Sequence, residues 1–448
     1  MGLSDATRLA LGRRLRLAQR EGRVPSLVAA LARGTEVLWS EAVGLAEVGG
    51  KRQPTLETQY RLGSITKTVT AAAILQLRDA GRLDLDDPLE RHLGPGAHGG
   101  ATIRQLLCHR AGLQREPPGE MWESMAAPGG TELLSLAETA EVVLPRGQRW
   151  HYSNLGFGLL GQVVGRCAGR AYEQVVDEGI LSPLGMRRTT WAPVAPAAHG
   201  YTVDPYVDGA RPEPPVDIKG LASAGQLWSS ATDLLRWGAF LCAPSTAVLA
   251  PATVDEMHLP QAIADPERWT RGWGLGPMLH RRGERIFGGH NGAMPGFLAS
   301  LVYSRPQQLV VALLTNAGSG IDIGATALDL LEEGLGGWVQ EPGPWEPEAG
   351  PSSPVEALLG RWWSEGSEWI FRLRHGELQA VMAGAAPTDE VSRFVAEGPD
   401  SFRTVSGGER GERLRVVRGP GGAVIKLYWA TYPFLRTASP TGEATPPD

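Results

Sequence analysis

Ser64 and Lys67 have the spacing of a nucleophile and its base. They stand three residues apart, just ahead of the apolar run 68–77, which predicts a buried helix. Residues three apart share one helix face, so the lysine amine lies beside the serine hydroxyl. Burial lowers the pKa of a lysine, which can then accept the serine proton, and the helix N-terminus offers backbone N–H groups to an oxyanion. The pattern predicts acyl transfer through Ser64. The alternative for an isolated match is a helix-capping serine beside a solvated lysine.

Tyr152 and Asn154 form a second polar pair, just before the apolar run 155–161. A phenol next to a buried lysine can be held as a phenolate and can carry protons between nucleophile and leaving group. The asparagine amide offers a donor and an acceptor to a substrate amide. A core tyrosine and a turn asparagine are the alternative interpretation.

His290 lies in a third segment, the glycine-rich stretch 288–293. The apolar stretches 297–303 and 309–314 follow it and predict strands of one antiparallel sheet. A histidine between glycines at a strand edge lets a substrate backbone approach closely. The alternative is a histidine in a turn.

The ordered motifs S-x-x-K, Y-x-N and H-x-G resemble those of class C β-lactamases and their relatives. These relatives are serine DD-peptidases, esterases, D-amino-acid peptidases and the penicillin-binding-protein-type thioesterases that cyclise nonribosomal peptides. The flanking segments 106–113, 181–186 and 222–234 are similar as well, and the resemblance spans residues 20–335. It implies that Ser64 attacks an acyl carbonyl while Lys67 and Tyr152 share the roles of base and acid.

The same resemblance implies the remaining site residues. Asn154 would orient the substrate amide, and the backbone N–H groups of Ser64 and Ala293, next to Gly292, would form the oxyanion hole. His290 takes the place of a lysine in many β-lactamases, and its neutral imidazole would bind a carboxylate less strongly, which disfavours a β-lactamase. The sequence has no H-E-x-x-H motif and no Cys/His cluster, so we expect neither a metal nor another cofactor.

Periodicity predicts an α+β fold for a catalytic domain over residues 1–340. A helical subdomain is expected beside an antiparallel sheet of five or more strands flanked by helices. The expected elements are a helix at 5–22, a hairpin at 26–43, a helical middle from 64 to about 245, strands at 273–316 and a helix at 324–334.

The last quarter of the chain changes character. The Pro-rich segment 341–354 predicts a semi-rigid linker. Short alternating strands over 355–436 predict a small antiparallel β-barrel, similar to the lipocalin-like barrel that several family relatives carry. Residues 437–448 are expected to be a disordered tail.

Composition restricts the partners and the cellular location that we expect for this protein. A net charge of −6 without a basic stripe disfavours a nucleic-acid partner, and three widely spaced cysteines predict free thiols. No signal peptide and no membrane-spanning run are evident, so we expect a cytoplasmic protein without a membrane partner. β-Lactamases and DD-peptidases act outside the membrane, so another acyl substrate is expected.

Two loops could shape a pocket. Met121, Trp122 and Met125 either line a peptide pocket or pack into the core, and the two interpretations have equal weight. The loop 202–220 is either a lid or a tolerated insertion, and the insertion is favoured.

Several functions compete. The first is an acyl-enzyme acting on a small molecule or peptide with a D-configured residue, which a carrier protein could present as a thioester. Water would make the protein a D-peptidase or esterase, whereas the substrate's own amine would make it a macrocyclising thioesterase. The absent leader, the barrel and the size resemble the cyclising group and favour release and macrocyclisation of a nonribosomal peptide.

A non-catalytic binding module is the remote alternative, which the intact set of motifs disfavours. Labelling with a fluorescent penicillin or a fluorophosphonate would separate them.

Overall fold

The computed structural model describes residues 2–204, 209–337, 353–374, 376–386 and 390–438. The chain forms two compact units, Met1–Glu341 and Pro342–Asp448. Most of the predicted linker 341–354 and of the predicted tail 437–448 lies outside the described residues.

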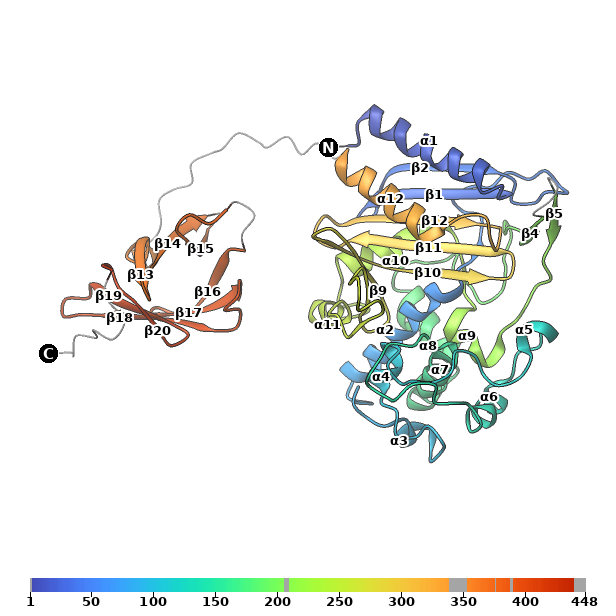
Figure 1. The fold of residues 1–448 in the computed structure, drawn as a ribbon, viewed down its shortest axis with the longest axis horizontal. Helices are drawn as coiled ribbons and strands as arrows, with labels where there is room; N and C mark the ends of the chain where they lie inside the picture. Colours follow the sequence, from blue (N-terminus) through green and yellow to red (C-terminus); the bar gives the residue numbers. More distant parts are fainter. Residues whose placement is uncertain (1, 205–208, 338–352, 375, 387–389, 439–448) are drawn as a thin grey trace. The chain divides into compact units, whose positions relative to one another are not determined.

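The N-terminal unit is built on an eight-stranded antiparallel sheet with the order β2-β1-β12-β11-β10-β9-β8-β7 (Figure 1). This agrees with the α+β fold and with a sheet of five or more strands. Its strands are β1 (Ser26–Arg33), β2 (Glu36–Gly44), β7 (Ala262–Ile263), β8 (Arg271–Trp273), β9 (Met278–Arg282), β10 (Arg285–Met294), β11 (Phe297–Ser304) and β12 (Leu309–Thr315).

Both faces of the central strands are buried, which explains why β1 is apolar throughout. Successive side chains of a strand point to opposite faces. Leu27, Ala29 and Leu31 pack with α1 (Asp5–Glu21) and α12 (Ile323–Gly336). Val28, Ala30 and Ala32 instead belong to the larger core shared with α2 (Thr66–Asp79) and α10 (Ala231–Cys242).

A helical region lies beside the sheet, as expected for residues 64 to about 245 (Figure 1). Its remaining helices are α3 (Leu89–Leu93), α4 (Ile103–Leu107), α5 (Met121–Ser124), α6 (Gly130–Ala137), α7 (Asn154–Ala168), α8 (Tyr172–Val176) and α9 (Ala222–Gly225). Short 3-10 turns span Gly63–Ile65 and Lys219–Leu221, and a π-helical turn spans Asp177–Leu181. Two small ribbons pair β3 (Tyr60–Arg61) with β6 (Trp228–Ser229) and β4 (Tyr201–Val203) with β5 (Ala210–Pro212).

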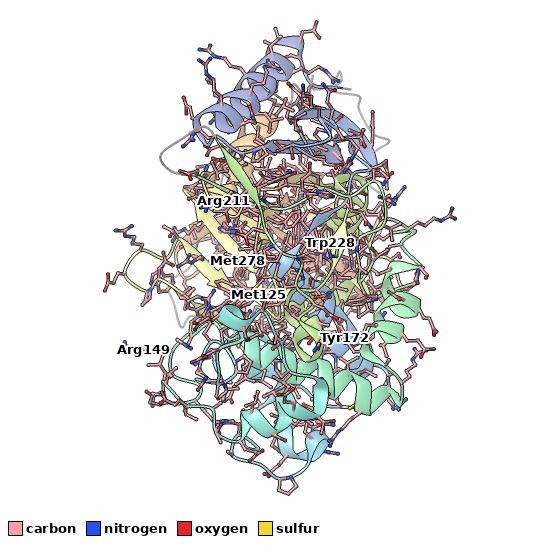
Figure 2. All side chains as sticks on the ribbon, turned by 90° about the vertical axis from the view of Figure 1, so that its right-hand side faces the viewer. Met125, Arg149, Tyr172, Arg211, Trp228 and Met278 are labelled. Atoms are coloured by element: carbon pink, nitrogen blue, oxygen red, sulfur yellow. The ribbon has the colours of Figure 1, made fainter. Side chains whose placement is uncertain are left out.

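The structure refines several local expectations. Between the helical middle and the predicted strands, a further helix forms, α11 (Pro251–Met257). Met121 begins α5 and is buried, Trp122 is exposed, and Met125, labelled in Figure 2, follows the helix. The three cysteines are free, as predicted. No helix among the described residues is long and apolar enough to cross a membrane.

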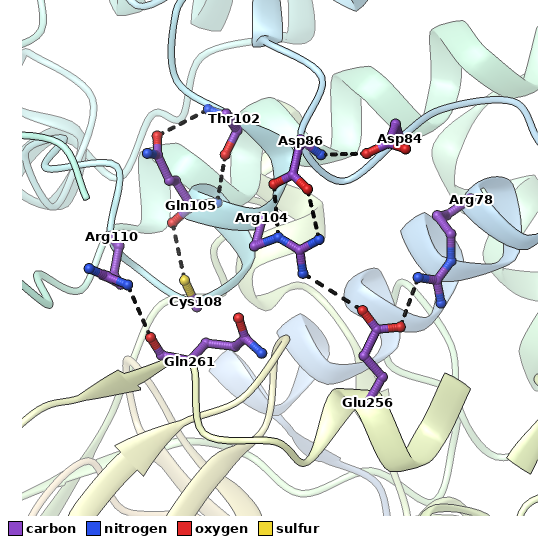
Figure 3. Close-up of polar contacts among 10 residues, drawn as sticks. All are labelled: Arg78, Asp84, Asp86, Thr102, Arg104, Gln105, Cys108, Arg110, Glu256 and Gln261. Atoms are coloured by element: carbon purple, nitrogen blue, oxygen red, sulfur yellow. Dashed lines mark hydrogen bonds and ion pairs between the residues drawn. The ribbon is translucent and has the colours of Figure 1, made fainter. Parts of the chain in front are cut away.

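A network of polar side chains holds α4 in place (Figure 3). Thr102 and Gln105 form a capping box at the start of α4. Arg104 binds Asp86 through two hydrogen bonds of 2.9 and 3.0 Å, and Glu256 lies 2.8 Å from Arg78 and 3.7 Å from Arg104. The network therefore ties α4 to both α2 and α11.

The C-terminal unit is a sheet of eight antiparallel strands in chain order. The strands are β13 (Gly360–Ser364), β14 (Ser367–Arg374), β15 (Glu377–Met382), β16 (Ser392–Gly398), β17 (Ser401–Ser406), β18 (Arg413–Arg418), β19 (Val424–Trp429) and β20 (Tyr432–Phe434), preceded by α13 (Ser353–Glu356). Trp363 and Leu435 exchange two backbone hydrogen bonds, of 2.8 and 2.9 Å, so the first and last strands meet. The sheet is nearly closed around an aromatic core, as a small barrel requires.

Candidate active site

Ser64 lies in the 3-10 turn Gly63–Ile65, two residues before the first residue of α2. Gly63 has φ +51, and a Cβ there would lie 2.7 Å from the Ala293 nitrogen. A Cβ on Gly292 would lie 1.8 Å from the Leu62 carbonyl oxygen. The two glycines therefore let β10 pack backbone to backbone against the nucleophile turn. The backbone segments at Ser64 and Ala293 therefore lie close together, and the oxyanion hole between their N–H groups stays a prediction.

Lys67 is fully buried, and three acceptors surround its amine. Nζ lies 3.0 Å from Ser64 Oγ, 2.7 Å from Asn154 Oδ1 and 2.6 Å from the Ala224 carbonyl oxygen. The two carbonyl-type oxygens can only accept, so they take two amine hydrogens. The lone pair of a neutral amine then faces Ser64 Oγ. Burial lowers the pKa of Lys67 well below its usual value, which favours this neutral form.

The Tyr152 hydroxyl hydrogen-bonds Ser64, so the serine has two proton-handling partners. Tyr152 is half-buried, and desolvation of its phenol raises the pKa of Tyr152. The raised pKa favours the neutral phenol over the phenolate that the sequence allows. A neutral phenol can donate a proton to a leaving group, while Lys67 is the better base for Ser64.

Asn154 opens α7, next to the N-cap Ser153. Its Oδ1 accepts from Lys67, and its Nδ2 donates to Glu116 Oε1 at 2.5 Å. Both ends of the amide are thus used inside the protein. The sequence predicts that Asn154 orients the substrate amide, whereas in this structure its side chain binds Lys67 and Glu116.

His290 lies within β10, between β9 and β11, rather than at a sheet edge or in a turn. Its Nδ1 is 2.6 Å from the Asn291 carbonyl oxygen, which only accepts, so Nδ1 carries the proton. Nε2 has no partner among the described residues. Burial lowers the pKa of His290 to about 3, so the ring is neutral and gives a carboxylate no opposite charge.

Sequence reasoning missed three residues at this site. The His109 ring stacks on Tyr152 with 4.3 Å between centroids, and its Nδ1 accepts from the Ser153 backbone at 3.1 Å. His109 lies in the segment 106–113, whose similarity to the family could have pointed to it. Glu116 accepts a hydrogen bond from Asn154 Nδ2, and burial raises the pKa of its carboxyl. The Arg115 guanidinium lies 5.0 Å above the Tyr152 ring. No motif marks either loop residue.

The site thus combines a serine, a neutral base and a phenol with two backbone N–H groups. This set can form and resolve an acyl-enzyme. Among the described residues, no group of three or more His, Cys, Asp or Glu side chains could hold a metal ion.

The profile of the family described as Beta-lactamase matches residues 11–335, and a domain of unknown function, DUF7586, matches residues 351–436. The chain therefore belongs to the β-lactamase and penicillin-binding-protein-like family of serine hydrolases.

Curated relatives share part of this chain. Esterase EstB of Burkholderia gladioli is 34% identical over 44% of this chain and 54% of its own length. The D-alanyl-D-alanine-carboxypeptidase/endopeptidase AmpH of Escherichia coli K12 is 30% identical over 43% of this chain and 51% of its own. The matched segments span about half the length of these relatives.

Two solved structures are similar over nearly their whole length. SurE with D-Leu has 27% identity and a TM-score of 0.60, with 97% of this chain and 100% of that chain covered. The D-stereospecific amidohydrolase from Streptomyces sp. has 27% identity and a TM-score of 0.62, with 72% and 98% covered.

Proposed function

We propose that this protein forms an acyl-enzyme at Ser64 with peptide-like acyl groups that carry a D-configured residue. The arrangement around Lys67 carries this proposal: two fixed acceptors and deep burial aim a neutral amine at the serine hydroxyl. Lys67 takes the Ser64 proton as Ser64 Oγ bonds to the acyl carbon. The oxyanion lies between the N–H groups of Ser64 and Ala293. Tyr152 donates its proton to the leaving group and regains one from the Lys67 ammonium, which returns Lys67 to its neutral form.

The preference for a D-residue is supported by two structural relatives with 27% identity. One was solved with D-Leu, and the other is named a D-stereospecific amidohydrolase. These names concern those proteins, and we extend them to this chain as part of the proposal.

We further propose that the substrate's own amine resolves the acyl-enzyme, which releases a macrocyclic peptide from a thioester such as one on a carrier protein. The neutral, buried His290 offers no positive charge to a free carboxylate product. Met125 and Trp122 provide apolar surface in the segment that follows Glu116, and such surface would slow attack by water if it lies over the acyl group. A tethered amine then competes through its high effective concentration.

The second candidate is a plain hydrolase, in which water resolves the acyl-enzyme. The named esterase and carboxypeptidase among the relatives favour it. Both candidates share every step up to the acyl-enzyme.

The test uses linear peptide thioesters of several lengths that end in a D- or an L-residue. Mass spectrometry of the released peptide distinguishes the cyclic product, which is one water lighter, from the acid, and Ser64→Ala is the control. We expect faster release of the D-series and a cyclic product at favourable lengths. Equal rates for both epimers would remove the stereochemical claim. Acid alone at every length would leave the hydrolase.

A further inference from the structure

The end of α4 has a histidine at a position where helices usually have a glycine. The Arg110 N–H donates to the Gln105 carbonyl at 2.7 Å and the His109 N–H to the Leu106 carbonyl at 3.2 Å, which are the two bonds of a Schellman motif. His109 is the left-handed residue of this motif, with φ +59. Glycine is favoured there because it has no Cβ. A glycine would end the helix at lower cost, so the reason for a histidine lies in what its side chain contacts.

His109 holds both chain neighbours of Tyr152. Its carbonyl oxygen accepts from the His151 N–H at 2.8 Å, and its Nδ1 accepts from the Ser153 N–H at 3.1 Å. The two bonds lie on either side of Tyr152 in the chain, and the Tyr152 ring itself stacks on the His109 ring with 4.3 Å between centroids. One residue thus restrains the backbone before and after the phenol as well as the phenol ring.

Aromatic side chains enclose the His109 ring. Only 2% of the residue is exposed, and the rings of Phe157, Trp273 and Trp150 have their centroids 5.1, 5.5 and 6.3 Å away. A backbone N–H can only donate, so Nδ1 offers its lone pair to Ser153 and the proton of the neutral ring is on Nε2. Burial lowers the pKa of His109 well below its usual value, which keeps that lone pair available at neutral pH. Both the orientation and the protonation state of the ring are therefore fixed.

We propose that His109 is a positioning residue that aims the Tyr152 hydroxyl at Ser64. This inference rests on the proposed role of Tyr152 as proton donor to the leaving group. Among the described residues, His109 hydrogen-bonds neither Ser64 nor Lys67, so it acts through Tyr152. A misplacement of about 1 Å at a reacting group can cost about 10²-fold in rate, so the loss of three restraints has a measurable effect.

A purely structural role makes a different prediction. If His109 only ended α4 and filled the core, its loss would slow the reaction of Ser64 by the same factor whether or not the Tyr152 hydroxyl is present. The test is therefore a double-variant cycle on the full chain, read as the rate at which a fluorophosphonate labels Ser64. We expect His109→Ala to label about 10²-fold more slowly than the unaltered chain. In the Tyr152→Phe background, the same change should cost less than about threefold, because no hydroxyl is left to position.

His109→Asn is the conservative variant. Asparagine tolerates the left-handed backbone, and its amide oxygen can take the place of Nδ1 as acceptor. We expect it to recover about tenfold of the lost rate, the scale of one hydrogen bond to a buried donor. His258→Ala is the matched control and should label at the unaltered rate. His258 also contacts a tyrosine, Tyr303, at 2.7 Å, and it makes none of the contacts described for the acyl-transfer site.

Circular dichroism establishes that each variant is folded. Equal slowing by His109→Ala with and without the Tyr152 hydroxyl would overturn the proposal, and so would an unchanged rate in His109→Ala when Tyr152→Phe is slow. If Tyr152→Phe itself labels at the unaltered rate, the proposed role of Tyr152 fails and the positioning role fails with it. If His109→Ala does not fold, the cycle with His109→Asn decides, since that variant should be about tenfold slow with the hydroxyl and little changed without it.

Discussion

The two units of the chain differ in whether they bury ionisable side chains. The N-terminal unit buries Lys67, Arg61 and several histidines, and burial shifts their pKa values. In the described part of the barrel, the buried side chains are apolar or uncharged polar, and the arginines stay near the surface. Arg403 and Arg413, for example, both bind Glu397 at the surface. Acid–base chemistry needs a perturbed ionisable group, so the comparison places the chemistry in the first unit.

This contrast between the two units would not hold if Ser64 and Lys67 were not the reacting groups. Ser64→Ala should abolish covalent labelling by a fluorophosphonate, and Lys67→Ala should slow it by roughly 10⁶-fold, the scale for losing a member of a nucleophile–base unit. Stopped-flow or time-course labelling, read by intact-protein mass spectrometry, measures both. An unchanged mass shift in Ser64→Ala would exclude Ser64 as the nucleophile.

Tyr152→Phe should slow acylation by about 10²–10⁴-fold, the usual contribution of a positioned proton carrier. The double variant with Lys67→Ala should be little slower than Lys67→Ala alone, because groups that pass one proton act as a unit. The same labelling rates test this. Simple multiplication of the two losses would show that the two groups act independently.

Glu116→Gln sharpens the comparison, because it alters the charge near Lys67 without removing the reacting groups. Glu116 raises the pKa of Lys67, so its neutralisation should lower that pKa further. Lys67 acts as a neutral base, and the acid limb of the acylation rate should shift to lower pH by about one unit. Glu116→Asp should restore the original limb in part. A pH–rate profile with an unmoved limb in Glu116→Gln would mean that the carboxylate does not act on the lysine.

Acid should destabilise the two units unequally. Burial lowers the pKa values of His258 and His280 to about 4 and that of His290 to about 3. The unfolded chain, with histidine near pH 6.5, binds more protons over this range, so unfolding free energy falls as pH falls from about 6.5 to 4. Each histidine contributes up to roughly 3 kcal/mol. The described barrel residues include no histidine. Calorimetry of the two separated units across pH should show the earlier loss in the first.

The smallest effect concerns removal of the barrel. A chain ending at Glu341 should keep Ser64 reactive towards a small ester, since the contacts described above for Ser64, Lys67 and Asn154 lie within the first unit. Turnover of p-nitrophenyl acetate by the shortened and full chains provides the measurement. A folded but unreactive shortened chain would mean that the barrel completes the site.

The sequence predicted that Ser64 and Lys67 lie together, because their spacing in the chain brings the two side chains side by side. Ser64 and Lys67 share one helix start, and the glycines at 63 and 292 allow only a close backbone approach. Glu116 could not be predicted, since its partner Asn154 is 38 residues away and neither loop length nor composition relates the two. The tyrosine's protonation state also depends on burial, which the motif Y-x-N does not encode.

The order of the strands has a consequence for synthesis on the ribosome. β1 pairs with β12, so Leu27 finds its partner Thr315 only after 288 further residues have been made. At roughly 5–20 residues per second, the apolar β1 waits on the order of 15–60 s for that neighbour. Each barrel strand, in contrast, pairs with the one made just before it. The catalytic unit is therefore the part of the nascent chain that most needs protection by chaperones.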